Sequence, residues 1–154
     1  MKLSTQSRYG VRAIFDIAYN SAHSPAQIQD IYRRQRIPPR YLEQIFQKLK
    51  RKGFLVSKRG PKGGYMLKKS PDQITIGDIV RSVEGNSRIV FCTELETGRK
   101  KCTLYDKCVT RQVWKEGHDR IFSYFDSITI NDLCKMAKEM GIKQEIGHQL
   151  SFAI

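Results

Sequence analysis

Four cysteines are the residues of this 154-residue sequence best suited to chemistry, and three of them lie in one polar stretch. Cys92, Cys102 and Cys108 follow the spacing C-x9-C-x5-C, whereas Cys134 stands apart. In a reducing cytosol, clustered cysteines more often bind a metal or sense oxidants than form structural disulfides. The spacing lacks the C-x2-C pairs of structural zinc sites, so it does not specify zinc. We therefore expect a metal-binding or redox-active loop.

Lysines accompany these thiols along the chain. Lys100, Lys101 and Lys107 would favour thiolates, which both cluster assembly and redox chemistry require. Cys134 falls in a later helical pattern, and we expect it to be a small buried residue. The chemistry is therefore expected from the other three cysteines.

A second chemically informative group is basic. Residues 1–70 hold 16 Lys and Arg against three Asp and Glu, which accounts for the whole net charge of +13. Such concentrated charge indicates a polyanionic partner, although a merely solubilising basic surface is the alternative. The split predicts two functional parts, one that meets an anion and one that carries the thiols.

The basic part has the pattern of a helix-turn-helix followed by a hairpin. Helices are predicted over about residues 7–21, 25–35 and 39–52, and a fourth ends near residue 85. Ser24 and Gln27 fit a capping box for the second helix, and Thr75 fits one for the fourth. Two strand-like runs, at 54–58 and 65–68, flank a glycine-rich basic tip. This order is that of a winged helix.

The third predicted helix offers side chains that could read bases. Arg40 suits guanine, Gln44 suits adenine, and Glu43 could accept from N4 of cytosine. Glu43 could instead be a solvated group or a partner of Gln47. Arg59 at the wing tip suits either a narrow minor groove or a phosphate.

Further basic residues are expected to contact phosphates, which give affinity without sequence choice. They are Arg8 and Arg12 on the first helix and Arg33, Arg34 and Arg36 around the turn. Duplex DNA is favoured over RNA because no aromatic-rich RNP-like strand or arginine-glycine tract is present. An enzyme is not predicted, since the three histidines are scattered and no phosphate loop or nucleophile-base signature occurs.

The neutral part is predicted to mediate dimerisation. A long helical pattern at about 110–126 carries exposed apolar residues that need a partner, and a second copy is the economical one. A final helix follows at 128–140, capped at Thr129 or Asn131. The expected organisation is therefore a winged helix-turn-helix domain at 1–85, a cysteine-bearing loop at 86–109, dimerisation and final helices at 110–140, and an unassigned tail at 141–154. The fold class is mainly α with a small β-hairpin.

The sequence shows no sign of membrane association. No run approaches about 18 apolar residues, and the chain turns polar before the apolar region of a signal peptide could form. We therefore expect a cytoplasmic protein with no membrane partner.

Several motifs together make the sequence similar to a known family. They are Arg8-Tyr9, Tyr41-Leu42-Glu43-Gln44, Arg59-Gly60-Pro61 with Gly63-Gly64-Tyr65, and Asp106-Lys107-Cys108 followed by Trp114. Over about residues 1–133 the chain resembles the winged-helix family of bacterial regulators that contains the iron-sulfur cluster regulator IscR, the nitric-oxide sensor NsrR and the cysteine-metabolism repressor CymR.

The resemblance implies a homodimeric transcription regulator that binds a double-stranded DNA operator. The third helix would enter the major groove and the wing arginine the minor groove. The residues that it implicates in DNA binding are Arg8, Tyr9, Arg40, Tyr41, Glu43, Gln44, Arg59 and Gly60. In the family's cluster regulator, a glutamate at the place of Glu43 helps to distinguish two operator classes, and cluster occupancy alters which class is bound.

The resemblance also implies a [2Fe-2S] cluster on Cys92, Cys102 and Cys108, with control of iron-sulfur cluster biogenesis genes and an iron-sulfur scaffold protein as candidate donor. Arg111 stands where the cluster regulator has a ligating histidine, and a protonated guanidinium cannot bind iron. The fourth ligand is therefore open. Candidates are His118 and the carboxylates Glu94, Glu96 and Asp106. A cluster-free redox or cysteine-metabolism repressor of the CymR type is the alternative.

Overall fold

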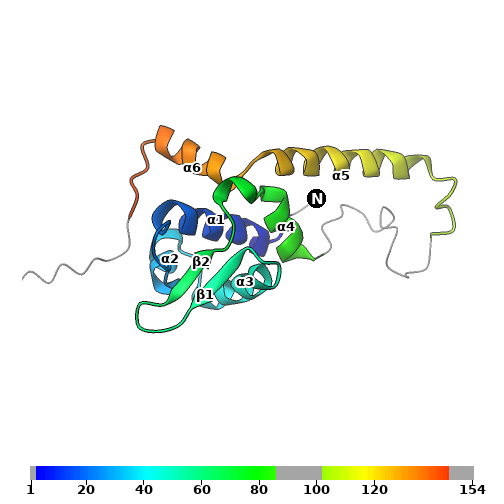
Figure 1. Cartoon of the computed structure of the whole chain (residues 1–154). Coiled ribbons are helices and arrows are strands. Elements are labelled where there is room, and N and C mark those ends of the chain that lie inside the picture. The colour runs from blue at the N-terminus through cyan, green and yellow to red at the C-terminus, as the bar shows by residue number, and fades with distance from the viewer. Residues whose placement is uncertain (1–2, 86–101, 146–154) are drawn as a thin grey trace, which may run out of the picture.

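Helices dominate the described part of the chain, which comprises residues 3–85 and 102–145 of a computed structural model. The elements, in chain order, are α1 (Thr5–Asn20), α2 (Ile28–Gln35), α3 (Pro39–Arg51), β1 (Leu55–Lys58), β2 (Gly64–Leu67), the 3-10 helix η1 (Pro71–Gln73), α4 (Ile76–Glu84), α5 (Val109–Ser127) and α6 (Ile130–Glu139). The two strands form an antiparallel hairpin on the side of the molecule away from α5 and α6 (Figure 1). The predicted class, mainly α with one small hairpin, is confirmed.

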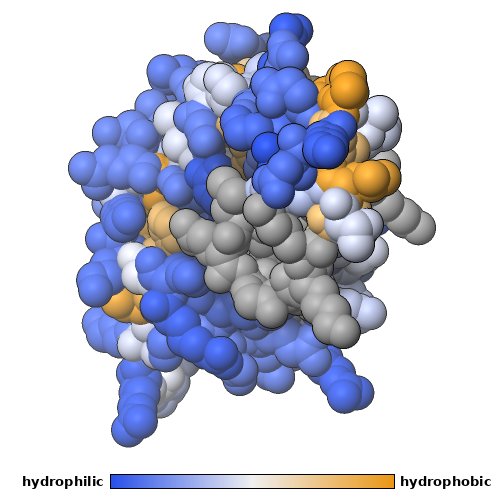
Figure 2. Space-filling model, turned by 90° about the vertical axis from the view of Figure 1, so that its right-hand side faces the viewer, coloured by the Kyte–Doolittle hydropathy of each residue, from blue (hydrophilic) through white to orange (hydrophobic). Residues whose placement is uncertain are grey.

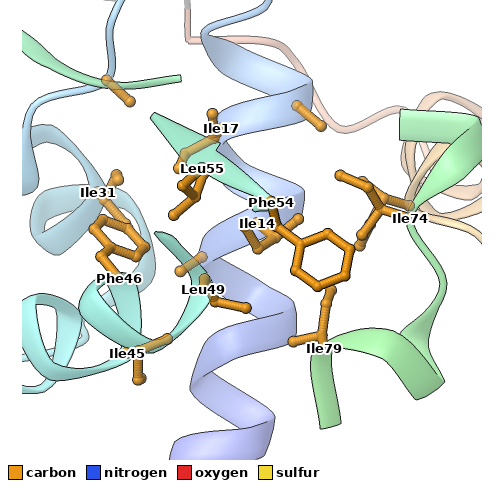
Figure 3. Packing of buried hydrophobic residues seen from close by; sticks show 14 of the residues in the cluster. Ile14, Ile17, Ile31, Ile45, Phe46, Leu49, Phe54, Leu55, Ile74 and Ile79 are labelled. Carbon is orange, nitrogen blue, oxygen red and sulfur yellow. The ribbon is translucent and has the colours of Figure 1, made fainter. Parts of the chain in front are cut away.

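The core is built around α1. Its residues Ile14 and Ile17 lie at the centre of the buried cluster, with Ile31 of α2 and Phe46 of α3 on one side and Ile79 of α4 on the other (Figure 3). These residues are fully or almost fully buried. Because the apolar residues recur at helical spacing, each amphipathic helix turns one stripe toward α1. This packing sets the angle at which α3 is presented.

The end of α3 leads directly into the hairpin. Gly53 has a φ of +77°, and the amides of Gly53 and Phe54 each donate over 3.0 Å, to the carbonyls of Lys50 and Leu49 respectively. These paired bonds are the Schellman motif, which favours glycine because its positive φ strains other residues. The predicted end of the third helix near residue 52 is confirmed, and the chain turns from α3 into the hairpin at this glycine.

The segment before α2 differs from the sequence prediction. No helix begins at residue 25: the first residue of α2 is Ile28, and its N-cap, Gln27, makes no side-chain cap bond. Ala26 instead pairs with Tyr65 of β2 through two backbone hydrogen bonds of 2.9 Å. A Cβ at Gly64 would collide with the Ala26 carbonyl, so glycine permits this approach. The wing pairing therefore keeps this stretch extended and overrides the local capping signal.

The helices α4, α5 and α6 meet at a polar junction. Thr75 and Thr129 each cap a helix with a complete capping box, and the two residues form an isolated antiparallel bridge. The cap predicted at Thr75 is confirmed, and Thr129 is the cap of the last helix. Beyond it, Cys134 lies buried in the same core as α1, as predicted. The final helix therefore packs against the winged helix.

The long helix α5 reaches past this junction. Its C-terminal half lies beside α4, and its N-terminal half extends away from the rest of the molecule (Figure 1). Phe122 is its one buried residue. None of the helices within residues 3–85 and 102–145 combines the length and apolar character that a membrane crossing requires.

Candidate nucleic-acid interface and thiol loop

The outward face of α3 carries the side chains expected to read bases. Arg40, Tyr41, Glu43 and Gln44 are all exposed. The opposite face of the same helix is fully buried in the core, through Leu42, Ile45, Phe46 and Leu49. Because the buried face fixes the rotation of α3, the polar face must point to solvent. This is the arrangement that a major-groove helix requires.

The start of α1 joins this face. The rings of Tyr9 and Tyr41 meet edge to face with 6.0 Å between centroids, and the Arg12 guanidinium lies 5.9 Å from the Tyr9 ring. Gln6 Nε2 lies 3.5 Å from Gln44 Oε1. The predicted positions on α1 and α3 therefore form one continuous surface. Arg8 is also exposed and directly precedes Tyr9 in α1.

The wing tip presents the remaining predicted DNA-binding residues. Arg59 and Gly60 are exposed, and Gly60 has a φ of +108°, in the region that favours glycine. The Gly63 amide donates to the Gly60 carbonyl at 2.8 Å, and Gln27 Nε2 donates to the Pro61 carbonyl at 3.2 Å. The tip is thus a closed turn that is tied to the start of α2.

One expected phosphate contact is wrong. Arg34 is buried, with 4% of its side chain exposed, and it pairs with the fully buried Asp16 at 2.7 Å. Burial alone would lower the pKa of Arg34, but the hydrogen bonds and charge of Asp16 outweigh it and raise that pKa. The guanidinium therefore serves the interior of the helix-turn-helix. Arg33 and Arg36 remain candidates for phosphate contacts.

Two of the three clustered cysteines lie within the described residues, in a compact loop before α5. The loop is built from turns, with the Tyr105 amide donating to the Cys102 carbonyl at 2.9 Å. The Arg111 guanidinium lies 3.9 Å from the Tyr105 ring centroid, a cation–π contact. Arg111 therefore folds the loop back on the first turn of α5, which brings Cys102 and the N-cap residue Cys108 into one short segment.

The surroundings of the Cys108 thiol favour its ionised form. Its Sγ lies 3.3 Å from the Thr110 hydroxyl, and this hydrogen bond lowers the pKa of Cys108, aided by the backbone amides of Arg111 and Thr110 and by the Arg111 charge. Thiolate character was expected from lysines, but the principal cause here is a hydroxyl beside the helix N-terminus. A thiolate is the form that binds metals and reacts with oxidants.

The described residues do not complete a set of cluster ligands. His118 follows Cys108 by ten residues, a rise of about 15 Å along α5, and its ring packs 4.6 Å from that of Phe122. Cys92, Glu94 and Glu96 lie outside the described residues. Within residues 3–85 and 102–145, no three metal-ligating side chains cluster. Asp106 lies in the same loop as both described thiols, and the fourth ligand stays open.

The sequence analysis did not predict the ion pair between α4 of the winged helix and α5. Arg81 of α4 pairs with Asp126 of α5 at 2.6 Å, and its guanidinium lies 5.3 Å from the Phe122 ring. The α4 helix also approaches α5 so closely that a Cβ at Gly77 would collide with Asp126. An ion pair between residues 45 positions apart leaves no local spacing signal.

The free end of α5 shows a mixed surface. Figure 2 looks onto this end: most of the coloured surface is hydrophilic, and hydrophobic residues show at the upper right and in smaller areas on the left. In α5, Val109 is 85% exposed, Val113 62% and Trp114 47%. Apolar side chains at this level of exposure indicate a partner surface.

The reading face, the wing and the basic charge define a winged-helix DNA-binding regulator. The family model for Rrf2, described as an iron-dependent transcriptional regulator, matches residues 3–136, and the chain belongs to this family. It is 37% identical over 133 residues to the HTH-type transcriptional regulator IscR of Cronobacter sakazakii, which covers 86% of this chain and 80% of the relative. The IscR of Escherichia coli O1:K1 is 36% identical over the same length.

Solved structures agree with this assignment. T. potens IscR superposes with a TM-score of 0.72 at 33% identity, covering 94% of this chain and 93% of that one. The B. subtilis cysteine regulator CymR superposes with a TM-score of 0.69 at 30% identity, covering 88% and 98%. The chain is a DNA-binding transcription regulator of the IscR type.

Proposed function

We propose that this regulator binds a [2Fe-2S] cluster through Cys92, Cys102 and Cys108, and that the cluster state selects its operators and so controls iron-sulfur cluster biogenesis genes. The observation that carries the proposal is the pair Cys102 and Cys108, which share one folded loop at the start of α5, where the pKa of Cys108 is lowered. Thiolates are the protein ligands of such clusters, and a bound cluster would supply redox chemistry.

DNA recognition would use two copies of the chain. The exposed apolar residues of α5, among them Val109, Val113 and Trp114, fit a homodimer contact. A two-fold dimer would set two copies of α3 into successive major grooves. Arg40, Tyr41, Glu43 and Gln44 would read bases, Arg59 and Gly60 would reach a minor groove, and Arg8 and Tyr9 would flank the contact.

A contact path joins the thiol loop to the reading helix. The loop sits on α5, and α5 is held to α4 by the Arg81–Asp126 pair. From α4, the Val83 carbonyl accepts from Lys48 Nζ of α3 at 2.8 Å. We expect Arg81→Ala to weaken the dependence of operator affinity on cluster state without changing cluster content. Lys115→Ala, which removes an exposed ion pair within α5, is the control.

Anaerobic purification tests the cluster directly. The expected result is a coloured protein with the absorption of a [2Fe-2S] centre and equal amounts of iron and inorganic sulfide. Cys102→Ala and Cys108→Ala should abolish the colour, whereas Cys134→Ala, which alters the buried thiol of α6, should retain it. Colourless wild-type protein, or loss of the cluster with Cys134→Ala alone, would contradict the ligand assignment.

A second function is favoured by one observation. The likeness to CymR reaches 30% identity with a TM-score of 0.69, and Cys108 is accessible to an oxidant. In that case the chain would bind DNA without a cluster, and its thiols would report oxidants. Operator affinity of iron-free protein that changes on peroxide treatment and returns with a dithiol reductant would support this alternative.

A further inference from the structure

The buried carboxylate of Asp16 lies at the centre of a polar cluster inside the helix-turn-helix. It accepts from Arg34 Nη2 at 2.7 Å and Arg34 Nε at 3.0 Å, and from Gln35 Nε2 at 2.9 Å. Arg34 and Gln35 are the last two residues of α2, and Asp16 lies in α1. Asp16 therefore ties the end of α2 to α1, immediately before the turn that leads into α3.

The same cluster extends to the C-terminal part of the chain. Asn20 donates to Asp16 Oδ1 at 3.2 Å, and its own Oδ1 accepts from the Glu145 amide at 2.8 Å. Gln144 Nε2 donates to the Tyr19 carbonyl at 2.8 Å, and the Tyr19 hydroxyl donates to the Ile142 carbonyl at 2.6 Å. Residues 142–145, here named the C-terminal strap, are thus hydrogen-bonded across the end of α1.

The charge of Glu145, in the strap, also acts on Arg34 of the buried Arg34–Asp16 pair. Asp16, Asp30 and Glu145 are the carboxylates whose charges act on Arg34. Arg34 Nη1 is buried and has no hydrogen-bond partner among the described residues. A buried guanidinium with one nitrogen unpaired depends strongly on its surroundings, because low dielectric strengthens both the attraction of nearby carboxylates and the cost of losing them.

The position of α2 decides where α3 begins. Arg36 is the one non-glycine residue with positive φ among those described, at 55°, and its amide donates to the Tyr32 carbonyl at 2.8 Å. Only Arg36, Ile37 and Pro38 separate α2 from α3. With so short and fixed a turn, a shift of the end of α2 must move the start of α3, where Arg40 lies.

We propose that Asp16 is a positioning residue for the reading helix and that the C-terminal strap stabilises it in this role, so that release of the strap lowers operator affinity. The proposal rests on the proposed role of α3 in reading bases and is independent of the cluster. The strap is exposed along its whole length and is held by few bonds. It can therefore open without unfolding the core.

Two truncations of the chain separate the strap from the residues that follow it. One ends at Gly141 and lacks the strap, and the control ends at Glu145 and retains it. The probe is a duplex that the full-length protein selects from a randomised pool. We expect the chain ending at Gly141 to bind this duplex about tenfold more weakly, with an unchanged salt dependence. The control should bind like the full-length protein.

Equal affinity of the two truncated chains would overturn the proposal. So would a smaller salt slope for the chain ending at Gly141, because that result would mean that Lys143 contacts a phosphate directly. If neither truncated chain nor the full-length protein selects a duplex, the failure lies with the proposed reading function and not with the strap.

A point variant guards against a folding defect of the truncated chain. Tyr19→Phe combined with Gln144→Ala removes two strap bonds and leaves the backbone and Lys143 intact. We expect a smaller loss of affinity in the same direction, together with a shifted NMR signal of the Arg34 Nε–H group. Unchanged affinity together with an unchanged Arg34 signal would contradict the proposal.

Discussion

The winged helix and the thiol-bearing arm, which comprises the cysteine loop at 102–108 and α5, differ in how they are stabilised. In the winged helix, every helix from α1 to α4 buries an apolar face, and even a carboxylate, Asp16, is fully enclosed. In α5, 19 residues long, Phe122 alone is buried. The first part can fold around its own core, whereas the second needs a partner for its apolar residues.

This contrast indicates where each function can reside. A DNA-reading surface must be rigid, and it lies on a helix whose other face is locked in the core. The proposed sensing element would have to respond to small free energies, and the thiols lie at the start of a helix with few buried contacts. The Arg81–Asp126 ion pair is one contact between the two parts, and we propose that a change in the second part acts on the first through it.

The largest expected difference concerns aspartates in the two parts. Asp16→Ala should lower the free energy of unfolding by about 3–5 kcal/mol, because it leaves Arg34 buried without its counter-ion. Asp119→Ala on α5 removes an exposed pair with Lys115 and should cost less than about 1 kcal/mol. Urea denaturation measures both values. Similar losses for the two variants would refute the contrast.

Helix caps give a smaller difference. Thr129→Ala removes the capping box of α6 at the junction and should cost about 1 kcal/mol. Cys108 occupies the N-cap of α5 but forms no capping box, and a thiol makes weaker hydrogen bonds to backbone amides than a hydroxyl or carboxylate does, so Cys108→Ala should change the free energy of unfolding by no more than about 0.5 kcal/mol. Thermal unfolding of the iron-free chain tests the pair, and a larger effect of Cys108→Ala would show that the arm is more cooperative than its burial indicates.

Basic residues should differ in their effect on DNA binding. Arg59→Ala at the wing tip should reduce the slope of log affinity against log salt by about 0.9, the value for one positive charge removed from the DNA contact. Arg120→Ala, which breaks an exposed pair on α5, should leave the slope unchanged. Titrations of one duplex at several salt concentrations give both slopes. A larger loss of affinity on A-tract sites than on sites without an A-tract would support the proposed minor-groove position of Arg59, and an equal loss on both would contradict it.

The smallest expected effect is a dependence of stability on pH at the start of the helix-turn-helix. Partial burial alone would raise the pKa of Glu84, but hydrogen bonds from Ser4 and Ser7 and the charge of Lys48 outweigh it and lower that pKa. A carboxylate with a lowered folded-state pKa stabilises the fold above about pH 4.3, the ordinary value, and this stability is lost as pH falls further.

Glu84→Gln should therefore flatten the acid limb of the stability profile. Glu116→Gln on α5 is the matched control, because Glu116 forms an exposed ion pair with Arg120 of the same helix. Chemical denaturation between pH 3 and 6 measures the two stability profiles. An acid limb that Glu84→Gln leaves intact would mean that other carboxylates dominate.

Much of the fold follows from local signals. The helical spacing of apolar residues, the cap at Thr75 and the stop at Gly53 each act within one or two turns of the chain, and the structure confirms them. The exposure of Arg40, Glu43 and Gln44 also follows, because their neighbours in the helix are apolar. Which bases they contact stays a prediction.

Other features could not be predicted because their causes lie far away in the chain. The Ser24 capping signal was overridden by backbone pairing between Ala26 and Tyr65. Arg34 is of a residue type that commonly contacts phosphates, yet its partner Asp16 stands 18 positions earlier and is buried. Neither the extended segment nor the buried pair leaves a periodic pattern.

The amino-acid sequence was sufficient to predict the family, the helix-turn-helix with its wing, the concentration of charge in the first 70 residues and the grouping of the thiols. These properties depend on residue type and on short spacings, which act before the chain is folded. The tertiary structure alone decided that Arg34 points inward, that Arg81 joins α4 to α5, and that residues 142–145 lie across α1. Each of these depends on which distant side chains share a low-dielectric interior, and only the packed helices bring those side chains together.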